Sequence, residues 1–599
     1  MREKVIRIGG ASGFWGDSSI SMPQLLSVPK LDYIVFDYLA ETTMAILQRA
    51  RMKNPEFGYA TDFVTGVIKP YLQQCLDKNI KLIANAGGLN PEACAQAIRL
   101  CARELGLAPT VAVVLGDDVS PRIENLREQG VTDMQGGKTL PAKVLSANAY
   151  LGAQPIAFAL AKGAQIVVTG RCVDSAVTLG ALAYEFGWAW DDWDRLAQGS
   201  LAGHMIECGA QATGGLFTDW QDVPDWANIG YPVLEVMQDG SFDIIKPDNT
   251  GGLISVGVCS EQLLYEIGDP ARYELPDVIC DFRQVSIQQI QTNRVRLEHA
   301  KGRPPSQQYK VSVTWQDGYQ LTTHQLIRGI NSVAKAHKTA EALLIRTRKQ
   351  LAENQFDDYT DHCIELLGYE SQYGANSRVS DSREVVLRIG LQHAQAKALS
   401  FMQKESISAG TSMGPGTRSH FGGRADIQPS IKLFSCLIDK HEVDTQVRIN
   451  DQIFDMPSPA YTTQVEPIAL KAIAARATFD ALDVEVPLVR LAWARSGDKG
   501  DDANIGVIAR RVEWLPLLRQ QLTVESVKRY FAHLVEGTVE RFDLPGIHGM
   551  NFLLHQALGG GGTASLRSDP LAKSFAQMLL DMPVTVPAQL LPLANTPAH

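Results

Sequence analysis

At 599 residues the chain is too long for one hydrophobic core, so we expect two to four domains. Hydrophobic residues at 45% and charged residues at 20% are typical of a globular protein, and the net charge of −10 argues against a general nucleic-acid or anionic-membrane surface. The nine cysteines are scattered without a CxxC pair, and no apolar run is long enough to span a bilayer. These features predict a cytoplasmic protein with reduced thiols, no membrane span and no nucleic-acid partner.

Strands and helices alternate along the first part of the chain. The pattern predicts strands at 5–8, 81–84, 110–115 and 165–169, a further strand with its exit over 33–42, and helices at 63–76, 92–105, 146–162 and 176–186. Such alternation indicates a parallel α/β domain over residues 1–215, for which we favour a doubly wound, Rossmann-like sheet. A partial barrel is the alternative, because alternation alone does not separate the two.

The residue pattern then changes and predicts a mixed α+β part over residues 216–460, with a hairpin turn at Asp239-Gly240 and a helix at 334–353. Residues 461–485 are predicted as a linker. A third domain at 486–588 has a βαββαβ-like order, typical of a ferredoxin-like fold, with helices predicted at 524–534, 552–558 and 571–580. Its stretch RSGDKGDDAN, residues 495–504, is interpreted either as a solvated hairpin loop or as a functional loop that closes on another domain.

Polar residues recur where the predicted parallel strands end. Ligands of open α/β sheets bind outside the carboxyl ends of the strands, so these exits predict one wall of a cleft between the first two domains. The first exit has small residues whose N–H groups can cradle an anion, although a sharp turn explains them equally well. We therefore expect substrate-binding residues among Gly10, Ser12, Gly13, Asp17, Glu41, Asn85, Gly87, Gly88 and Asp117.

The exit of the strand at 165–169 holds several candidate catalytic residues close together in the sequence. Arg171 can hold a carboxylate or phosphate, and Asp174 and Asp37 can transfer protons. Cys172 is interpreted as a buried inert thiol, because no base is fixed near it by spacing, although His204 is a candidate. The predicted catalytic set is therefore Asp37, Arg171, Asp174 and His204.

His204, Glu207 and Cys208 have i, i+3, i+4 spacing, so one helix face could carry all three. That face could bind a metal, but the combination is common by chance, so we predict no metal, and the sequence names no cofactor. Residues 410–424 hold five glycines with Arg418 and Arg424, which indicates an anion-binding loop or a flexible lid. Those arginines, with Asp498 and Lys499, complete the predicted substrate-binding set, for which a coenzyme A thioester is considered.

Several long stretches resemble the acyclic terpene utilisation family (AtuA) in order along nearly the whole chain. They are GGASGFWGDS, YIVFDYLAETT, LIANAGGLNP, VTGRCVDSAVTLG, NTGGLISV with EQLLYEIGDP, and LAWARSGDKGDDANIG. The resemblance implies a role in citronellol and geraniol catabolism, where branched acids are degraded as coenzyme A thioesters. It also implies the C-terminal ferredoxin-like domain, but it brings no catalytic residues.

Two functions follow. The first is an enzyme that acts on a branched acyl-CoA or its acid, of lyase, hydratase or hydrolase type. The second is a non-catalytic assembly or binding subunit of the pathway, with the C-terminal domain as its docking or oligomerisation unit. In either case we expect a homo-oligomer, and for the enzyme a small-molecule substrate.

Overall fold

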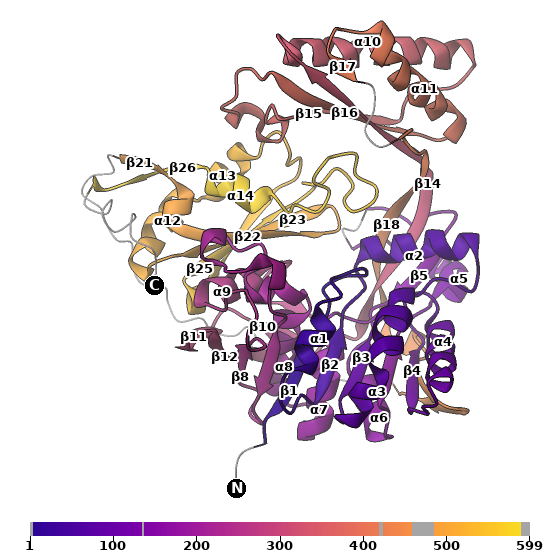
Figure 1. Cartoon of the computed structure of the whole chain (residues 1–599), viewed down its shortest axis with the longest axis vertical. Helices are drawn as coiled ribbons and strands as arrows, with labels where there is room; N and C mark the ends of the chain where they lie inside the picture. The colour runs from indigo at the N-terminus through magenta and orange to yellow at the C-terminus, as the bar shows by residue number, and fades with distance from the viewer. Residues whose placement is uncertain (1–3, 135–136, 419–422, 458–483, 589–599) are drawn as a thin grey trace.

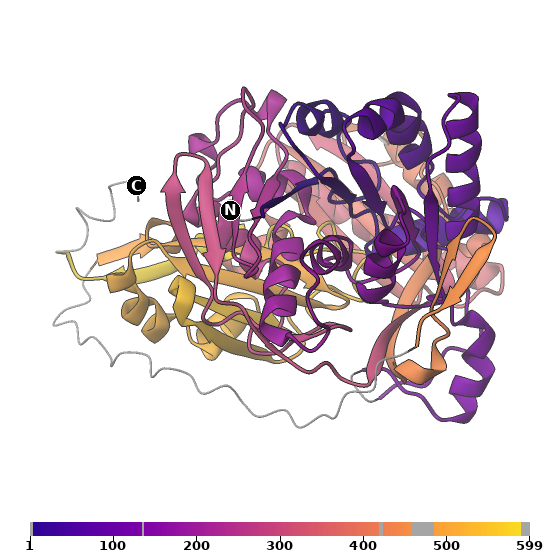
Figure 2. The same ribbon diagram turned by 90° about the horizontal axis from the view of Figure 1, so that it is seen from below.

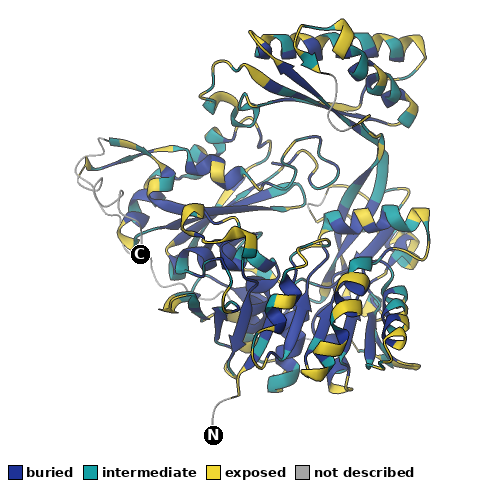
Figure 3. Cartoon of the chain, viewed as in Figure 1, coloured by how far each residue is buried: buried dark blue, intermediate teal, exposed yellow. Residues whose placement is uncertain are grey.

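The computed structural model describes residues 4–134, 137–418, 423–457 and 484–588. Figure 1 shows a large sheet with its helices, built mainly from the N-terminal part of the chain. The C-terminal domain lies beside this sheet, and a further lobe lies at the far end of two long strands. The buried residues follow the strands, while the outer faces of the helices are exposed (Figure 3).

The large sheet has eleven strands in the order β11-β12-β8-β7-β1-β2-β3-β6-β4-β19-β20. Its five central neighbours run parallel: β1 (Ile6–Gly10), β2 (Tyr33–Phe36), β3 (Lys81–Ala84), β6 (Ile166–Thr169) and β4 (Val111–Leu115). Parallel neighbours end at the same edge, so the exits of β2, β3, β6 and β4 meet there.

Antiparallel strands extend this sheet on both sides. Beyond β1 lie β7 (Val233–Val236), β8 (Phe242–Ile245), β12 (Arg294–Glu298) and β11 (Ser286–Gln291), and beyond β4 lie β19 (Gln446–Ile449) and β20 (Gln452–Asp455). The sheet is therefore mixed, and it includes strands from beyond residue 215. The doubly wound, Rossmann-like description and the division into residue ranges stay predictions.

The central strands are apolar on both faces because helices cover both. Ile166 and Val168 belong to one core cluster, and Val167 between them belongs to the other, as the period of two in a strand requires. Figure 2 shows helices on both sides of these strands. The first cluster includes side chains of α1 (Ser21–Leu26), α2 (Glu41–Lys53), α3 (Lys69–Asp77) and α4 (Pro91–Glu104), and the second those of α5 (Ile123–Glu128), α6 (Gln154–Ala161), α7 (Ala176–Phe186) and α8 (Trp193–Ile206).

The strand β14 (Gln308–Arg328) is 21 residues long and links two parts of the molecule. Near its start it pairs with β5 (Ser146–Ala149) and β18 (Gln428–Asp439), beside the large sheet. Its far end pairs with β16 (Glu384–His393) and β17 (Thr417–Arg418), and β15 (Asp361–Leu367) pairs with β16. With α10 (Ser332–Glu353) and α11 (Ala396–Ser412) these strands form the lobe at the top of Figure 1, which has its own core.

The C-terminal domain is built on a four-stranded antiparallel sheet in the order β22-β23-β25-β24. These strands are β22 (Ala492–Lys499), β23 (Asp502–Ala509), β25 (Gly549–Leu554) and β24 (Val539–Leu544); β21 (Val484–Pro487) pairs with β26 (Pro583–Val586). Ala494 and Val507 face the domain's own helices, α12 (Leu515–Gln521), α13 (Val524–Tyr530) and α14 (Phe575–Leu580).

The other face of that sheet packs on the rest of the chain. Trp493 and Ile508 belong to the core cluster that also includes Val258 and Leu263 of α9 (Val256–Leu264). A small sheet of β9 (Tyr273–Glu274), β10 (Ile279–Asp281) and β13 (Lys301–Arg303) lies on α8. The C-terminal domain therefore uses one sheet face within this chain, and that face is not a free docking surface.

Most predicted elements are confirmed, and three are wrong. The helix predicted at 146–162 begins only at Gln154, because Ser146–Ala149 pairs with β14 as β5. The helix predicted at 552–558 begins in β25, whose apolar side chains fill the domain core. The stretch 495–504 is not a loop but the end of a β-hairpin, with the strands β22 and β23 paired up to Lys499 and Asp502.

Candidate functional site

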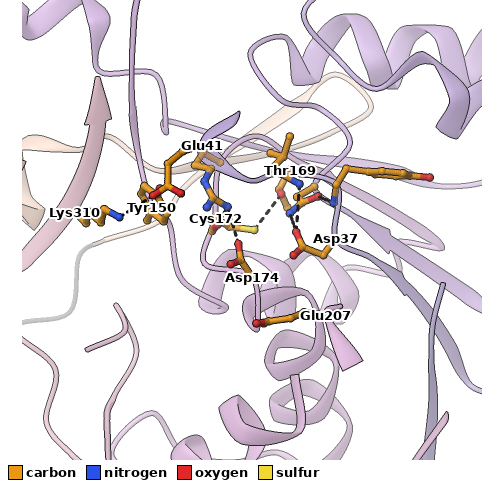
Figure 4. A network of polar contacts seen from close by, with 12 residues as sticks. Asp37, Glu41, Tyr150, Thr169, Cys172, Asp174, Glu207 and Lys310 are labelled. Carbon is orange, nitrogen blue, oxygen red and sulfur yellow. Dashed lines mark hydrogen bonds and ion pairs between the residues drawn. The ribbon is translucent and has the colours of Figure 1, made fainter. Parts of the chain in front are cut away.

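The strand exits do converge. Asp37 follows β2, Asn85 follows β3, Asp117 follows β4, and Arg171 and Asp174 follow β6. Figure 4 shows the carboxylates of Asp37, Asp174 and Glu207 around a common region, with Glu41, Tyr150 and Lys310 on one side of it. We call Asp37, Glu41, Asn85, Tyr150, Arg171, Asp174, Glu207 and Lys310 the strand-end site.

Asp37 is a buried acid that forms no ion pair with any cation of the described residues. The residue is 8% exposed, and its carboxylate accepts a hydrogen bond from the amide of Asn85, whose Oδ1 accepts the N–H of Tyr38 at 2.7 Å. Burial raises the pKa of Asp37 well above its usual value, and the carboxylates of Asp174 and Glu207 raise it further. Asp37 therefore holds a proton at a pH where an exposed aspartate is charged.

Arg171 is 3% exposed, and its guanidinium carbon lies 4.0 Å from the ring centroid of Tyr150. Its Nη1 donates to Asp174 Oδ1 at 2.8 Å and to the carbonyl of Cys172 at 2.7 Å. Its Nε has no hydrogen-bond partner among the described residues. Arg171 thus fixes Asp174, whose side chain is 31% exposed and so the more accessible acid.

Glu41 connects the site to two residues that the sequence did not indicate. Its Oε1 accepts hydrogen bonds from the hydroxyl of Tyr150 at 2.8 Å and from Nζ of Lys310 at 3.0 Å. The charge of Lys310 holds the pKa of Glu41 well below its usual value. Tyr150 follows β5 and Lys310 lies in β14, so only the pairing of those strands brings them here.

Glu207 and His204 form a buried pair. Nδ1 of His204 lies 2.9 Å from Oε1 of Glu207, and Nε2 lies 3.1 Å from the carbonyl of Leu263. Both ring nitrogens thus have a partner. His204 contacts Glu207 and is not available as a free base. Burial raises the pKa of Glu207 to about 7, although His204 opposes this, and Oε2 of Glu207 has no partner among the described residues.

The i, i+3 spacing of His204 and Glu207 already predicted that both side chains lie on one helix face. It did not reveal that Glu207, outside the predicted catalytic set, is the member beside Asp174. The predicted role of His204 in catalysis stays a prediction, and the geometry makes it a positioning residue for Glu207.

Asp117 has a structural environment. It is 3% exposed and accepts the N–H of Arg171 at 2.8 Å and the amide of Asn148 at 2.9 Å, both on Oδ2. Burial raises its pKa to about 7. A Cβ at Gly170 would lie 2.3 Å from Asp117 Oδ1, so this glycine permits the close contact of the β4 and β6 exits.

The predicted residues of the first exit are engaged in packing and turn contacts. A Cβ at Gly10 would lie 2.7 Å from the carbonyl of Ile206, and one at Gly13 equally close to the backbone of Cys208. Ser12 donates its hydroxyl to the carbonyl of Asp37 at 3.2 Å. Asp17 accepts the N–H of Gly13 at 2.9 Å and the hydroxyl of Tyr231 at 2.7 Å.

The same holds for the glycines after β3. A Cβ at Gly87 would lie 2.5 Å from the carbonyl of Thr169, and Gly88 has a φ of +52° next to Leu47. These residues explain how the exits approach one another. Their predicted role in substrate binding has no geometric support beyond that.

Asp498 and Lys499 lie at the end of β22, where the hairpin approaches Tyr273 of β9. Nζ of Lys499 is 5.7 Å from the ring centroid of Tyr273, the residue of β9 that faces His204 with ring centroids 6.0 Å apart. Burial raises the pKa of Asp498 to about 8. The charge of Glu266 is the next contribution to this rise, and the charge of Glu41 contributes as well. The end of the hairpin therefore contacts another part of the chain, while its functional role stays a prediction.

Arg418 and Arg424 are not brought to this site. Arg418 pairs with Leu326 near the far end of β14, sixteen residues from Lys310, which is roughly 50 Å of extended strand. Arg424 is exposed and follows it in sequence, beside Ala425, whose carbonyl bonds to Gln403 of α11. Residues 419–422 of the predicted loop lie outside the described residues.

One group in the described ranges has three metal-type ligand atoms close together: Asp439, His441 and Glu442, on the surface after β18. It is separate from the strand-end site and consists mostly of exposed side chains. Within the same ranges, no helix is long and apolar enough to cross a membrane.

The model of the acyclic terpene utilisation family protein AtuA matches residues 6–449, and that of the AtuA ferredoxin-like domain matches residues 486–585. Searches of curated proteins and of solved structures gave no match.

Proposed function

Because this chain belongs to the acyclic terpene utilisation family, we propose that its strand-end site is the active site of an enzyme of acyclic terpene catabolism. The enzyme acts by general acid–base catalysis on a branched acyl-CoA or its acid, as a hydratase or lyase. The observation that carries the proposal is the convergence of three carboxyl groups at the strand ends: the buried Asp37 and Glu207, whose pKa values burial raises, and the ion-paired Asp174.

Hydration of a double bond next to a carbonyl, and carbon–carbon cleavage next to one, both move protons to and from carbon and oxygen. They need an acid and a base in environments that push their pKa values apart. Burial raises the pKa of Asp37 well above its usual value and that of Glu207 to about 7, so these two side chains are the candidates for the acid. Asp174, bound to Arg171 at 2.8 Å and partly exposed, is placed to accept a proton.

Covalent catalysis by a thiol has little support. Cys172 is 1% exposed, its Sγ lies 3.5 Å from Thr169 Oγ1, and burial raises its pKa to about 12. A thiol in this state is not a nucleophile at neutral pH. Hydratase and lyase chemistry are therefore preferred to a cysteine hydrolase.

The thioester form of the substrate is proposed from the family resemblance. Arg418 and Arg424, considered for the phosphates of coenzyme A, lie at the far end of β14 from this site. Both the free acid and its thioester consequently belong in the test.

The proposal is tested by incubating the purified protein with citronellate, geranate and their coenzyme A thioesters, and following the products by mass spectrometry. Asp37→Asn and Glu207→Gln keep size and hydrogen bonding but remove the proton, and each is expected to lower turnover by about 10²–10⁴-fold. Cys172→Ala is the matched control from the same strand exit and keeps its turnover.

If both folded carboxyl variants support wild-type turnover and growth on citronellol, the enzyme proposal is wrong. The non-catalytic subunit is then the better description.

A further inference from the structure

The large sheet ends at β11 in an edge strand that no other described strand covers. β11 pairs with β12 on one side, and its other side is the border of the sheet. Its last four residues are exposed, and Figure 1 shows β11 and β12 at the end of the sheet away from β4. Part of the backbone N–H and carbonyl groups of an edge strand point away from its neighbour, so this edge can accept a further strand.

Charged residues or prolines protect the edge strands of natural proteins against such pairing. The opposite edge of the same sheet follows this rule, since β20 has four residues and ends at Asp455. So do edge strands of the lobe and of the C-terminal domain, because β15 contains Asp361 and Glu365, and β24 contains Glu540 and Asp543. β11 has the sequence SIQQIQ, with neither a charged residue nor a proline. Among the exposed edge strands that the structure describes, β11 alone lacks both.

The arginines next to β11 are balanced inside the sheet. Arg296 of β12 lies opposite Gln288 in the register, and its Nε donates to Asp243 of β8 at 2.6 Å. Arg294 of β12 donates to the same carboxylate at 2.6 Å and to Glu235 of β7 at 2.7 Å. Both guanidinium groups therefore bond toward the interior of the sheet, away from the edge.

One irregularity lies within β11. Its pairing with β12 shifts between Gln289 and Gln291, so Ile290 is the extra residue of a bulge, and it is 48% exposed. The amide of Gln289 donates to the carbonyl of Ile254 at 3.3 Å and to that of Gln291 at 2.8 Å, on either side of the bulge. The bulge is next to the hairpin turn, so Ser286–Gln289 keeps a regular register and Ile290 is presented at the edge.

We infer that the outer edge of β11 is the interface at which two copies of this chain pair antiparallel, as one continuous sheet. A two-fold axis places each strand against its own sequence. The side chains of β11 suit that arrangement, because glutamine amides and serine hydroxyls both donate and accept hydrogen bonds, and the isoleucines pack on each other.

The charge of the whole chain favours the same contact. With a net charge of −10, two copies repel each other, and this repulsion is smallest where the contact strand holds no acid. β11 is such a strand. The homo-oligomer expected from the sequence thus has its contact in the large sheet, while one sheet face of the C-terminal domain is used within the chain.

The test measures the mass of the full-length protein in solution by size-exclusion chromatography with light scattering. The protein is loaded at about 100 µM, above the micromolar Kd expected of a small interface. The wild type should be a dimer. Gln288→Glu/Ile290→Glu should be monomeric, because each copy then sets like charges against those of the other. Gln288→Lys/Ile290→Lys should be monomeric for the same reason.

An equimolar mixture of the Glu and Lys variants should form the dimer again, because opposite charges then meet across the interface. The matched control is Gln452→Glu/Ile453→Glu, at exposed positions of β20 on the opposite edge of the sheet, which should stay dimeric. Circular dichroism checks that each variant is folded.

A monomeric wild type would overturn the inference, as would open-ended association, since a two-fold contact closes at the dimer. A dimer that persists in both the Glu and the Lys variants would place the interface elsewhere. A mixture that stays monomeric would show that β11 does not meet β11. None of these measurements depends on turnover, so they stand apart from the test of the proposed function.

Discussion

The guanidinium of Arg495 and the carboxylate of Glu261 form an ion pair at 3.0 Å that joins the C-terminal domain to α9. Glu261 is fully buried and Arg495 nearly so, and Nη1 of Arg495 also donates to Oε1 of Gln211 at 2.8 Å. A charge buried at such a contact is tolerated only with its partner. Removing this pair therefore tests how much it contributes to the contact between the C-terminal domain and α9.

Arg495→Met should leave Glu261 buried without a cation and cost about 3–5 kcal/mol of stability. The double variant Arg495→Met/Glu261→Gln should recover part of this loss, because the buried charge is gone. Urea unfolding followed by tryptophan fluorescence measures both. Arg348→Met, which breaks the exposed pair with Asp358, is the control and should cost at most about 1 kcal/mol. A loss no larger than in this control would show that the domain contact does not depend on the pair.

Gly170→Ala should destabilise the protein by about 1–3 kcal/mol, because the added methyl would lie 2.3 Å from the carboxylate of Asp117. The control is Gly66→Ala on the exposed side of the helical segment Phe63–Ile68, where the new methyl meets nothing within 4 Å. That substitution should be neutral or stabilising by up to about 1 kcal/mol. Thermal unfolding of the two variants at one pH separates the predictions, and equal midpoints would contradict them.

Asp117 should make the folded state less stable as the pH rises. Its pKa is about 7 in the folded protein and close to 3.8 in an unfolded chain, so between these values the folded state binds more protons. The free energy of unfolding then falls with increasing pH over that range, by at most about 4 kcal/mol from this group.

Asp117→Asn keeps an oxygen acceptor for the N–H of Arg171 and removes the titration. Its midpoint relative to wild type should therefore be higher at pH 7.5 than at pH 5. A difference that does not change with pH would show that Asp117 is charged in the folded state.

The turnover of the proposed enzyme should fall as the pH rises through about 7, the pKa to which burial raises Glu207. An acid catalyst is lost on the alkaline side, so kcat/KM has a descending limb there. Glu207→Gln should show a low rate without that limb, while Cys172→Ala should keep the wild-type profile. If the limb persists in Glu207→Gln, another group, such as Asp37, controls it.

Local sequence patterns predicted much of the fold. The strand at 81–84 and the helix at 176–186 lie where the pattern placed them, because each has a continuous apolar face of the right period. The helix predicted at 146–162 failed at Ser146–Ala149, whose small residues suit a helix but pair with β14. Pairing with a strand more than 160 residues away outweighed local propensity.

The site divides in the same way. Asp37, Glu41, Asn85, Arg171 and Asp174 were predicted from the sequence as site candidates, because a strand that ends in a polar residue is a local signal. Tyr150 and Lys310 carried no such signal. Arg418 and Arg424 belong to a glycine-rich stretch whose composition indicated anion binding, but they lie elsewhere in the structure. Glu207 was visible only as a neighbour of His204 on one helix face.

The sequence by itself determined the family, the parallel strands and the polar character of their exits, because these are written in residues adjacent along the chain. Only the tertiary structure decided which acids face one another and which cations are already paired. Charge pairing and burial depend on contacts between segments hundreds of residues apart, and those contacts set the pKa values on which the proposed chemistry rests.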